Sequence, residues 1–97
     1  MARCSYEKIQ DLEPAFVIIK SWDKIKESKP GIYYLKTQGF LHFHISQIDG
    51  EEKIWADCFD GSNWGEIITI PTKITAHFIK KFIAEVKKRY KNTFELL

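Results

Sequence analysis

Two strand-like runs separated by Asp49-Gly50 constrain the fold of this chain more than any other feature. The first run, FLHFHISQ at 40–47, alternates apolar and polar side chains, and the second, EKIWADCF at 52–59, offers apolar side chains to pair with them. Asp-Gly readily takes the left-handed backbone angles of a tight hairpin turn. The centre of the chain is therefore predicted to be a long antiparallel β-hairpin.

The apolar side chains also predict the register of this hairpin. If Ile48 stands opposite Glu51, one face becomes wholly apolar, with pairs Leu41–Cys58, Phe43–Ala56 and Ile45–Ile54. A one-residue slip would mix polar and apolar side chains on both faces. On the opposite face this register places His44 across from Trp55 and His42 across from Asp57. Phe40 and Ser46 share that face by alternation.

Two more strands are predicted on either side of this hairpin. The segment 31–36, GIYYLK, joins 40–47 through the turn TQG, which would place Ile32 and Tyr34 on the apolar face and Tyr33 and Leu35 beside the histidines. A fourth strand, EIITI at 66–70, follows the polar loop DGSNWG. Pro71 closes it, and Thr72 is predicted to cap the following helix.

Helices are predicted at both ends of the chain. Pro14 can begin the first, which carries apolar residues at helical spacing: Ala15, Ile18, Ile19, Trp22 and Ile25. Its run AFVII also fits a short buried strand, so 15–20 remain open between helix and strand, with the helix preferred. Ile9 and Leu12 are assigned to a preceding turn on the same core, and Pro30-Gly31 ends the segment. The last helix has the clearer stripe: Phe78, Phe82, Val86 and Tyr90, with Ile79 and Ile83 beside them.

The predicted order is α-β-β-β-β-α, a two-layer α+β sandwich. An antiparallel sheet of three to four strands is covered on one face by the N- and C-terminal helices. A length of 97 residues fits a single domain, 1–97. No apolar run is long enough to span a membrane, and the segment MARCSYEKIQDLE has no apolar signal region, so a soluble cytoplasmic protein is expected. In that compartment Cys4 and Cys58 are expected to be free thiols.

The predicted face away from the helices carries the candidate ligand-binding residues: Tyr33, His42, His44, Trp55 and Asp57. Opposed residues in a sheet have Cβ atoms about 5 Å apart, close enough for a hydrogen bond between His42 and Asp57. Two histidines from a His-x-His strand plus a carboxylate could also hold Zn or Fe with one coordination position open. The interpretation preferred over a metal site is polar side chains on an open sheet face, with His42 and Asp57 as a cross-strand pair and no cofactor.

Other functional classes have weaker support. No GxSxG, P-loop or GxGxxG motif is present, and Cys58 is predicted to point into the core, away from both histidines. We expect no catalytic residue on these grounds. Nucleic-acid binding would use the basic run 80–91 and exposed rings of Tyr33, Phe40, Trp55 and Trp64. The lysines and the rings are predicted on opposite sides of the sheet, so nucleic acid is not the expected partner.

An uncovered sheet face with several aromatic rings is typical of a binding surface. The favoured function is therefore a non-enzymatic binding module, acting through self-association as a homodimer or through a protein or small-ligand partner. The metal site, with a metal-dependent hydrolase as its enzymatic form, is the first alternative. Nucleic-acid binding through the basic C-terminal helix is the second.

The phrase PGIYYLKTQGFLHFH, followed by WADC, resembles a pattern in a family of small bacterial proteins without an assigned activity. There a Pro-Gly-aromatic strand leads to an FLHFH-like strand and then to an alanine–aspartate pair. The matching positions are Pro30, Gly31, Tyr33, Tyr34, Leu35, 40–44, Ala56 and Asp57. The resemblance implies a soluble bacterial protein and supplies no mechanism, but its pattern includes His42, His44 and Asp57.

Overall fold

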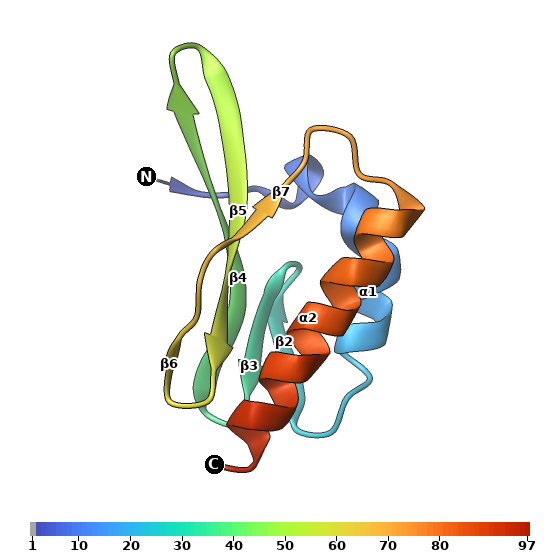
Figure 1. The fold of residues 1–97 in the computed structure, drawn as a ribbon, viewed down its shortest axis with the longest axis vertical. Coiled ribbons are helices and arrows are strands. Elements are labelled where there is room, and N and C mark those ends of the chain that lie inside the picture. Colours follow the sequence, from blue (N-terminus) through green and yellow to red (C-terminus); the bar gives the residue numbers. More distant parts are fainter. Residues whose placement is uncertain (1) are drawn as a thin grey trace.

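A long antiparallel hairpin forms the centre of the sheet, and two helices cover one of its faces (Figure 1). The computed structural model describes residues 2–97. The predicted α+β class, with the helices on one side of an antiparallel sheet, is confirmed. The elements are β1 (Ala2–Arg3), 3-10 turns at Tyr6–Lys8 and Gln10–Leu12, α1 (Glu13–Ile19), β2 (Ile25–Lys29), β3 (Ile32–Leu35), β4 (Gln38–Ile48), β5 (Glu51–Asp60), β6 (Asn63–Trp64), β7 (Ile68–Ile70) and α2 (Ala76–Phe94).

The β4–β5 hairpin has the predicted register. His42 stands opposite Asp57 and His44 opposite Trp55, and Ile48 pairs with Glu51 at the turn. Asp49 and Gly50 both take left-handed backbone angles, with φ of 53° and 79°. Two such residues match the twist of the flanking strands, which is why Asp-Gly specifies this turn so well.

Shorter strands complete the sheet on both edges of the hairpin. Over residues 2–97 it has seven strands, with β2-β3-β4-β5-β6 in order, β1 also on β4 and β7 also on β5. The predicted strands at 31–36 and 66–70 correspond to β3 and β7. Three strands were not predicted: β1, β2 and β6. They are short or polar, so they carry little alternation of apolar side chains.

The predicted facing of the first hairpin was wrong. Leu35 pairs with Gln38 and Tyr34 with Gly39, but Tyr33 pairs with Leu41, so β4 contains a bulge at Phe40. The extra residue shifts the alternation. Tyr33 and Leu35 are consequently buried, and the Tyr33 ring packs on Phe16 of α1 with centroids 5.7 Å apart.

The same bulge corrects the prediction for Phe40, which was expected on the histidine face. Its ring is fully buried and lies edge-on to Tyr90 of α2, with 6.3 Å between centroids. Tyr34 is 39% exposed, whereas it was expected in the core. The aromatic residues exposed on this face therefore differ from those that the sequence predicts: Tyr34 is exposed and Phe40 is not.

The helix preferred for 15–20 is confirmed, but it is shorter than predicted. It ends at Ile19, and Ile25 begins strand β2 instead of continuing the apolar stripe. Ile18 is 43% exposed, while Ala15, Phe16 and Ile19 are buried. Ile9 and Leu12 are buried in the preceding 3-10 turns, as expected.

Helix α2 follows its predicted stripe, with Phe82, Val86 and Tyr90 buried against the sheet and α1. Its N-cap is Thr75, whose hydroxyl accepts the backbone N–H of Phe78; the predicted cap, Thr72, lies three residues upstream. In the described part of the chain, no helix is both long enough and apolar enough to cross a membrane.

Candidate functional site

Three potential metal ligands meet on the sheet face away from the helices. One ligand atom from each of His42, His44 and Asp57 lies within 4.8 Å of the others. The two histidines share a face of β4 because they are two residues apart, and the β4–β5 register brings the aspartate alongside them. We call these three residues the His-Asp cluster.

The carboxylate of Asp57 contacts His44, not His42 as predicted. His44 Nε2 lies 2.7 Å from Asp57 Oδ2, which is hydrogen-bonding distance. The two positions are diagonal neighbours on paired strands, and an imidazole and a carboxylate are long enough to bridge that separation. Both side chains are largely shielded, with 16% and 26% of their surface exposed.

His42 is held between other rings. Its imidazole is edge-on to His44, with centroids 4.7 Å apart, and edge-on to Trp64 at 4.9 Å. Its Nδ1 is buried and has no hydrogen-bond partner among the described residues. Burial lowers the pKa of His42, as do His44 and Arg3, while Asp57 opposes the change. The ring is therefore kept neutral, the form in which histidine binds a metal.

Aromatic side chains surround the His-Asp cluster. Trp55 lies beside His44, with ring centroids 5.6 Å apart, and Trp64 covers His42. The rings of Tyr34 and Trp64 both lie beside Gly39: a Cβ there would meet both rings at 3.7–3.9 Å. Of the five predicted ligand-binding residues, four lie together on this face, and Tyr33 lies in the core. Sequence reasoning missed Tyr34 and Trp64 as members of this site.

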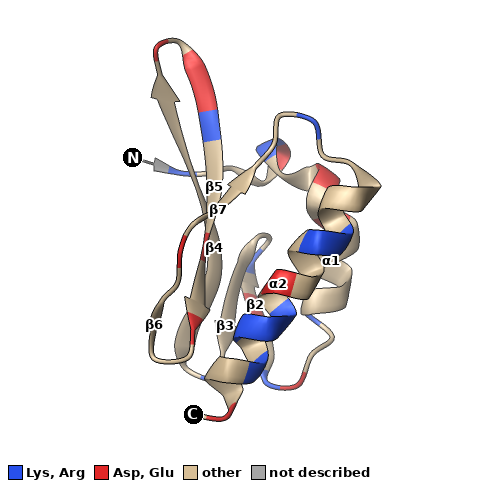
Figure 2. Cartoon of the chain, viewed as in Figure 1, with Lys and Arg blue, Asp and Glu red and all other residues tan. Residues whose placement is uncertain are grey.

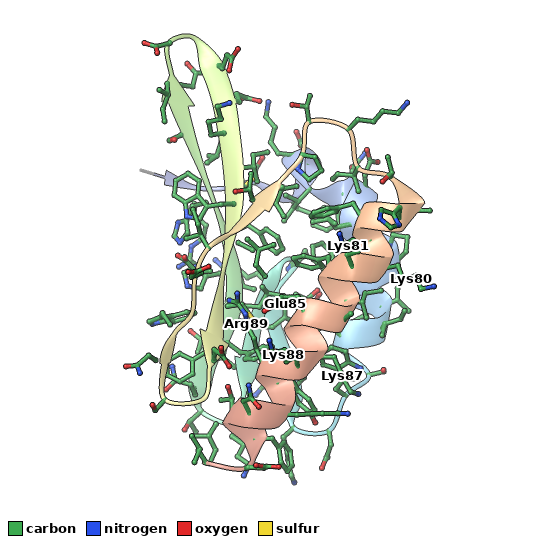
Figure 3. The ribbon with its side chains drawn as sticks, in the orientation of Figure 1. Lys80, Lys81, Glu85, Lys87, Lys88 and Arg89 are labelled. Carbon is green, nitrogen blue, oxygen red and sulfur yellow. The ribbon has the colours of Figure 1, made fainter. Side chains whose placement is uncertain are left out.

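Arg89 of α2 anchors the loop that positions Trp64. Its Nη1 donates to the carbonyl oxygens of Cys58 and Glu66 at 3.1 and 2.9 Å, and its Nε donates to Glu85 at 2.8 Å. Gly65 passes so close that a Cβ there would lie 2.7 Å from Nη1. Figure 3 shows Arg89 between α2 and the strands, whereas Lys80 projects away from the sheet. The sequence does not distinguish Arg89, which is buried, from the exposed lysines of the same basic run.

Neither cysteine belongs to the His-Asp cluster. Cys58 is fully buried on the helix side, and burial raises the pKa of its thiol to about 12. A thiol with this pKa remains protonated and unreactive at neutral pH. Cys4 is also buried, and its pKa is likewise raised by burial.

The basic charge of α2 lies on the helix layer (Figure 2). The His-Asp cluster lies on the other face of the sheet, because its residues alternate with the buried Phe43, Ala56 and Cys58. Part of the basic charge is already engaged within the protein. Lys87 Nζ lies 4.4 Å from the ring centroid of Trp22, and Arg89 is only 6% exposed. Phosphate groups would have to compete with these contacts, and the rings available for stacking are on the other face.

The lowered pKa of His42 predicts a pH dependence of stability in the metal-free protein. Because the folded state resists protonation of His42, the unfolded chain binds that proton more readily. The stabilisation is complete above about pH 6.5, the ordinary histidine value, and is lost as the pH falls through the lowered folded value. The free energy of unfolding, measured with urea, should therefore fall less between pH 7.5 and pH 5.0 in His42→Gln than in the parent protein.

His77→Gln is the matched control, because His77 is exposed on α2. This variant should lose as much stability as the parent between the two pH values. Equal losses in His42→Gln and the parent would mean that His42 is as easily protonated in the folded as in the unfolded chain.

Comparisons with known proteins assign no family. No family model matches the chain, and neither a curated protein nor a solved structure is significantly similar to it. The resemblance to the FLHFH pattern remains a prediction.

Proposed function

We propose that this protein binds one divalent transition-metal ion through His42, His44 and Asp57. The observation that carries the proposal is the convergence of three ligand atoms within 4.8 Å on one face of the β4–β5 hairpin. Two imidazoles and one carboxylate are a donor set suited to Zn²⁺ or Fe²⁺, with coordination positions left for water or a ligand. The sequence favoured a non-enzymatic binding face, with the metal site as its first alternative; the geometry of the cluster supports that alternative.

The ligand atoms would have to move to share an ion. Metal–ligand bonds of about 2.1 Å at tetrahedral angles place ligand atoms roughly 3.4 Å apart. The ligand atoms of the cluster lie within 4.8 Å of one another, and His44 Nε2 and Asp57 Oδ2 are 2.7 Å apart, so side-chain rotation that separates this pair and brings His42 nearer would give that spacing. The buried Nδ1 of His42 would gain a partner if that nitrogen binds the ion.

Cobalt(II) titration tests the proposal, since Co²⁺ occupies Zn²⁺ and Fe²⁺ sites and reports its ligands by visible absorption. We expect saturable ligand-field bands at one equivalent of Co²⁺ per chain, bleached by excess Zn²⁺. The same titration of His77→Ala should be unchanged, because His77 lies on the exposed surface of α2. Absence of saturable bands at submillimolar protein and metal, where these weak bands can be measured, would refute the proposal.

Self-association through the same face is a second candidate, as the sequence predicts. It is favoured by the exposure of two large rings close together, Trp64 at 45% and Tyr34 at 39%. Neighbouring exposed rings are typical of interface centres. If the protein is a dimer in solution, Trp64→Ala should raise its dissociation constant about tenfold or more, measured by analytical ultracentrifugation. Val17→Ala, on exposed α1 surface, is the control, and a monomeric parent protein would exclude this candidate.

A further inference from the structure

A small hollow adjoins the His-Asp cluster. It has a volume of about 130 Å³ and is lined by Arg3, Ile32, Tyr33, Tyr34, Gly39, His42 and Trp64. His42 lines the hollow and is also a member of the His-Asp cluster. A molecule in this hollow would therefore lie next to an ion held by the cluster. The strands that form the lining come from three parts of the chain: β1, the β3–β4 hairpin and β6.

The charge of the hollow favours an anion. Strand β1 pairs with β4 so that Arg3 stands directly opposite His44. The Arg3 guanidinium forms no ion pair with any acidic side chain among residues 2–97, and the carboxylate of Asp57 is engaged with His44. A divalent ion and an uncompensated arginine outweigh the single charge of Asp57. The guanidinium fork matches the two oxygens of a carboxylate.

The shape of the hollow favours a flat group about the size of one ring. Its volume is close to the roughly 150 Å³ of a protein cavity that accepts benzene. The rings of Trp64 and Tyr34 flank it, and Gly39 leaves its floor open where any other residue would place a Cβ. Flat molecules pack on such rings in offset or edge-to-face geometry.

We propose that the hollow binds a small aromatic monocarboxylate, whose oxygens meet Arg3 and the open position of the metal while its ring lies between Trp64 and Tyr34. This inference depends on the proposed metal function, because the ion supplies one of the two contacts to the carboxylate. It goes further by naming the ligand class and by assigning Arg3, Tyr34, Gly39 and Trp64 as binding residues.

The test uses the protein of residues 1–97 loaded with Co²⁺, with benzoate as the probe. Benzoate should shift the cobalt absorption bands and quench tryptophan fluorescence with the same dissociation constant. Acetate, which lacks the ring, should bind at least about tenfold more weakly, because it loses the stacking contact. Inorganic phosphate distinguishes a general oxyanion site: binding as tight as benzoate would overturn the assignment to an aromatic carboxylate.

Two variants test the two contacts of the ligand: Arg3→Gln tests the contact to the carboxylate, and Gly39→Ala tests the space for the ring. Arg3→Gln should weaken benzoate at least about tenfold, as expected for loss of a charge-assisted hydrogen bond, while leaving Co²⁺ affinity unchanged within about twofold. Gly39→Ala should weaken benzoate more than acetate. Its Cβ would meet no atom closer than 3.7 Å, so the variant should fold normally and only fill the hollow. Lys91→Gln, on exposed α2 surface, is the matched charge control.

The outcomes separate this inference from the proposed function. If Co²⁺ does not bind, the metal function fails. If Co²⁺ binds but millimolar benzoate leaves both its spectrum and the tryptophan fluorescence unchanged, the ligand assignment is wrong and the metal function stands. Benzoate binding that is indifferent to Arg3→Gln would also overturn the assignment.

Discussion

Replacing His44 by alanine should weaken the binding of Zn²⁺ or Co²⁺ at least about a hundredfold. Even loss of a residue that only orients a ligand typically costs ten- to a hundredfold in metal affinity, and loss of a ligand costs more. His44 contributes one of three ligand atoms and also holds Asp57 at 2.7 Å. His42→Ala is expected to have a similar effect. The measurement is competition with a chromophoric zinc chelator.

The matched control is Gln47→Ala, on the same strand but exposed and outside the His-Asp cluster. Its metal affinity should equal that of the parent. Both histidine variants should keep the parent's far-ultraviolet circular dichroism, because neither imidazole belongs to the apolar core. A His44→Ala protein that folds and still binds metal with parental affinity would rule out the cluster as the site.

Arg89→Met should lower the free energy of unfolding by about 3 kcal/mol. The substitution keeps the aliphatic bulk but removes the hydrogen bonds from the guanidinium to the carbonyl oxygens of Cys58 and Glu66, and Cys58 keeps only the N–H of Gly65. A hydrogen bond from a charged donor contributes about 1.5–3 kcal/mol, and two are lost here. Loss of this anchor should also release the Gly65 segment, so the emission of Trp64 should shift to longer wavelength as its ring becomes more exposed.

Lys88→Met provides the comparison, since Lys88 is the exposed neighbour of Arg89 on α2. Surface substitutions of this kind usually change stability by less than about 0.5 kcal/mol. Urea denaturation measures both variants. A loss in Arg89→Met no larger than that in Lys88→Met would show that the buried guanidinium does not hold the loop.

The centre of the site could be predicted because its determinants are local. The β4–β5 register follows from a two-residue turn and from alternation over two long strands, and these bring His42, His44 and Asp57 together. The pairing within the cluster could not be predicted in the same way. The register determines which Cα atoms oppose each other. Whether Asp57 contacts His44 or His42 depends on the side-chain conformations of the two imidazoles.

The rim of the site was mispredicted for a different reason. The turn between β3 and β4 is formed at Lys36 and Thr37, with Lys36 at a φ of 57°, and lysine is not a residue that signals this conformation. One bulge at Phe40 then reversed the facing of Tyr33 and Tyr34. Trp64 and Arg89 are placed by contacts between distant segments, which residue patterning does not encode.

Native mass spectrometry is the measurement that decides whether His42, His44 and Asp57 hold one metal ion. It would use untagged protein, purified without chelator and given one equivalent of Zn²⁺. We expect a parent protein heavier by one zinc ion per chain and a metal-free His42→Ala/His44→Ala double variant under the same conditions. A parent protein that remains metal-free, or a double variant that binds zinc equally well, would contradict it.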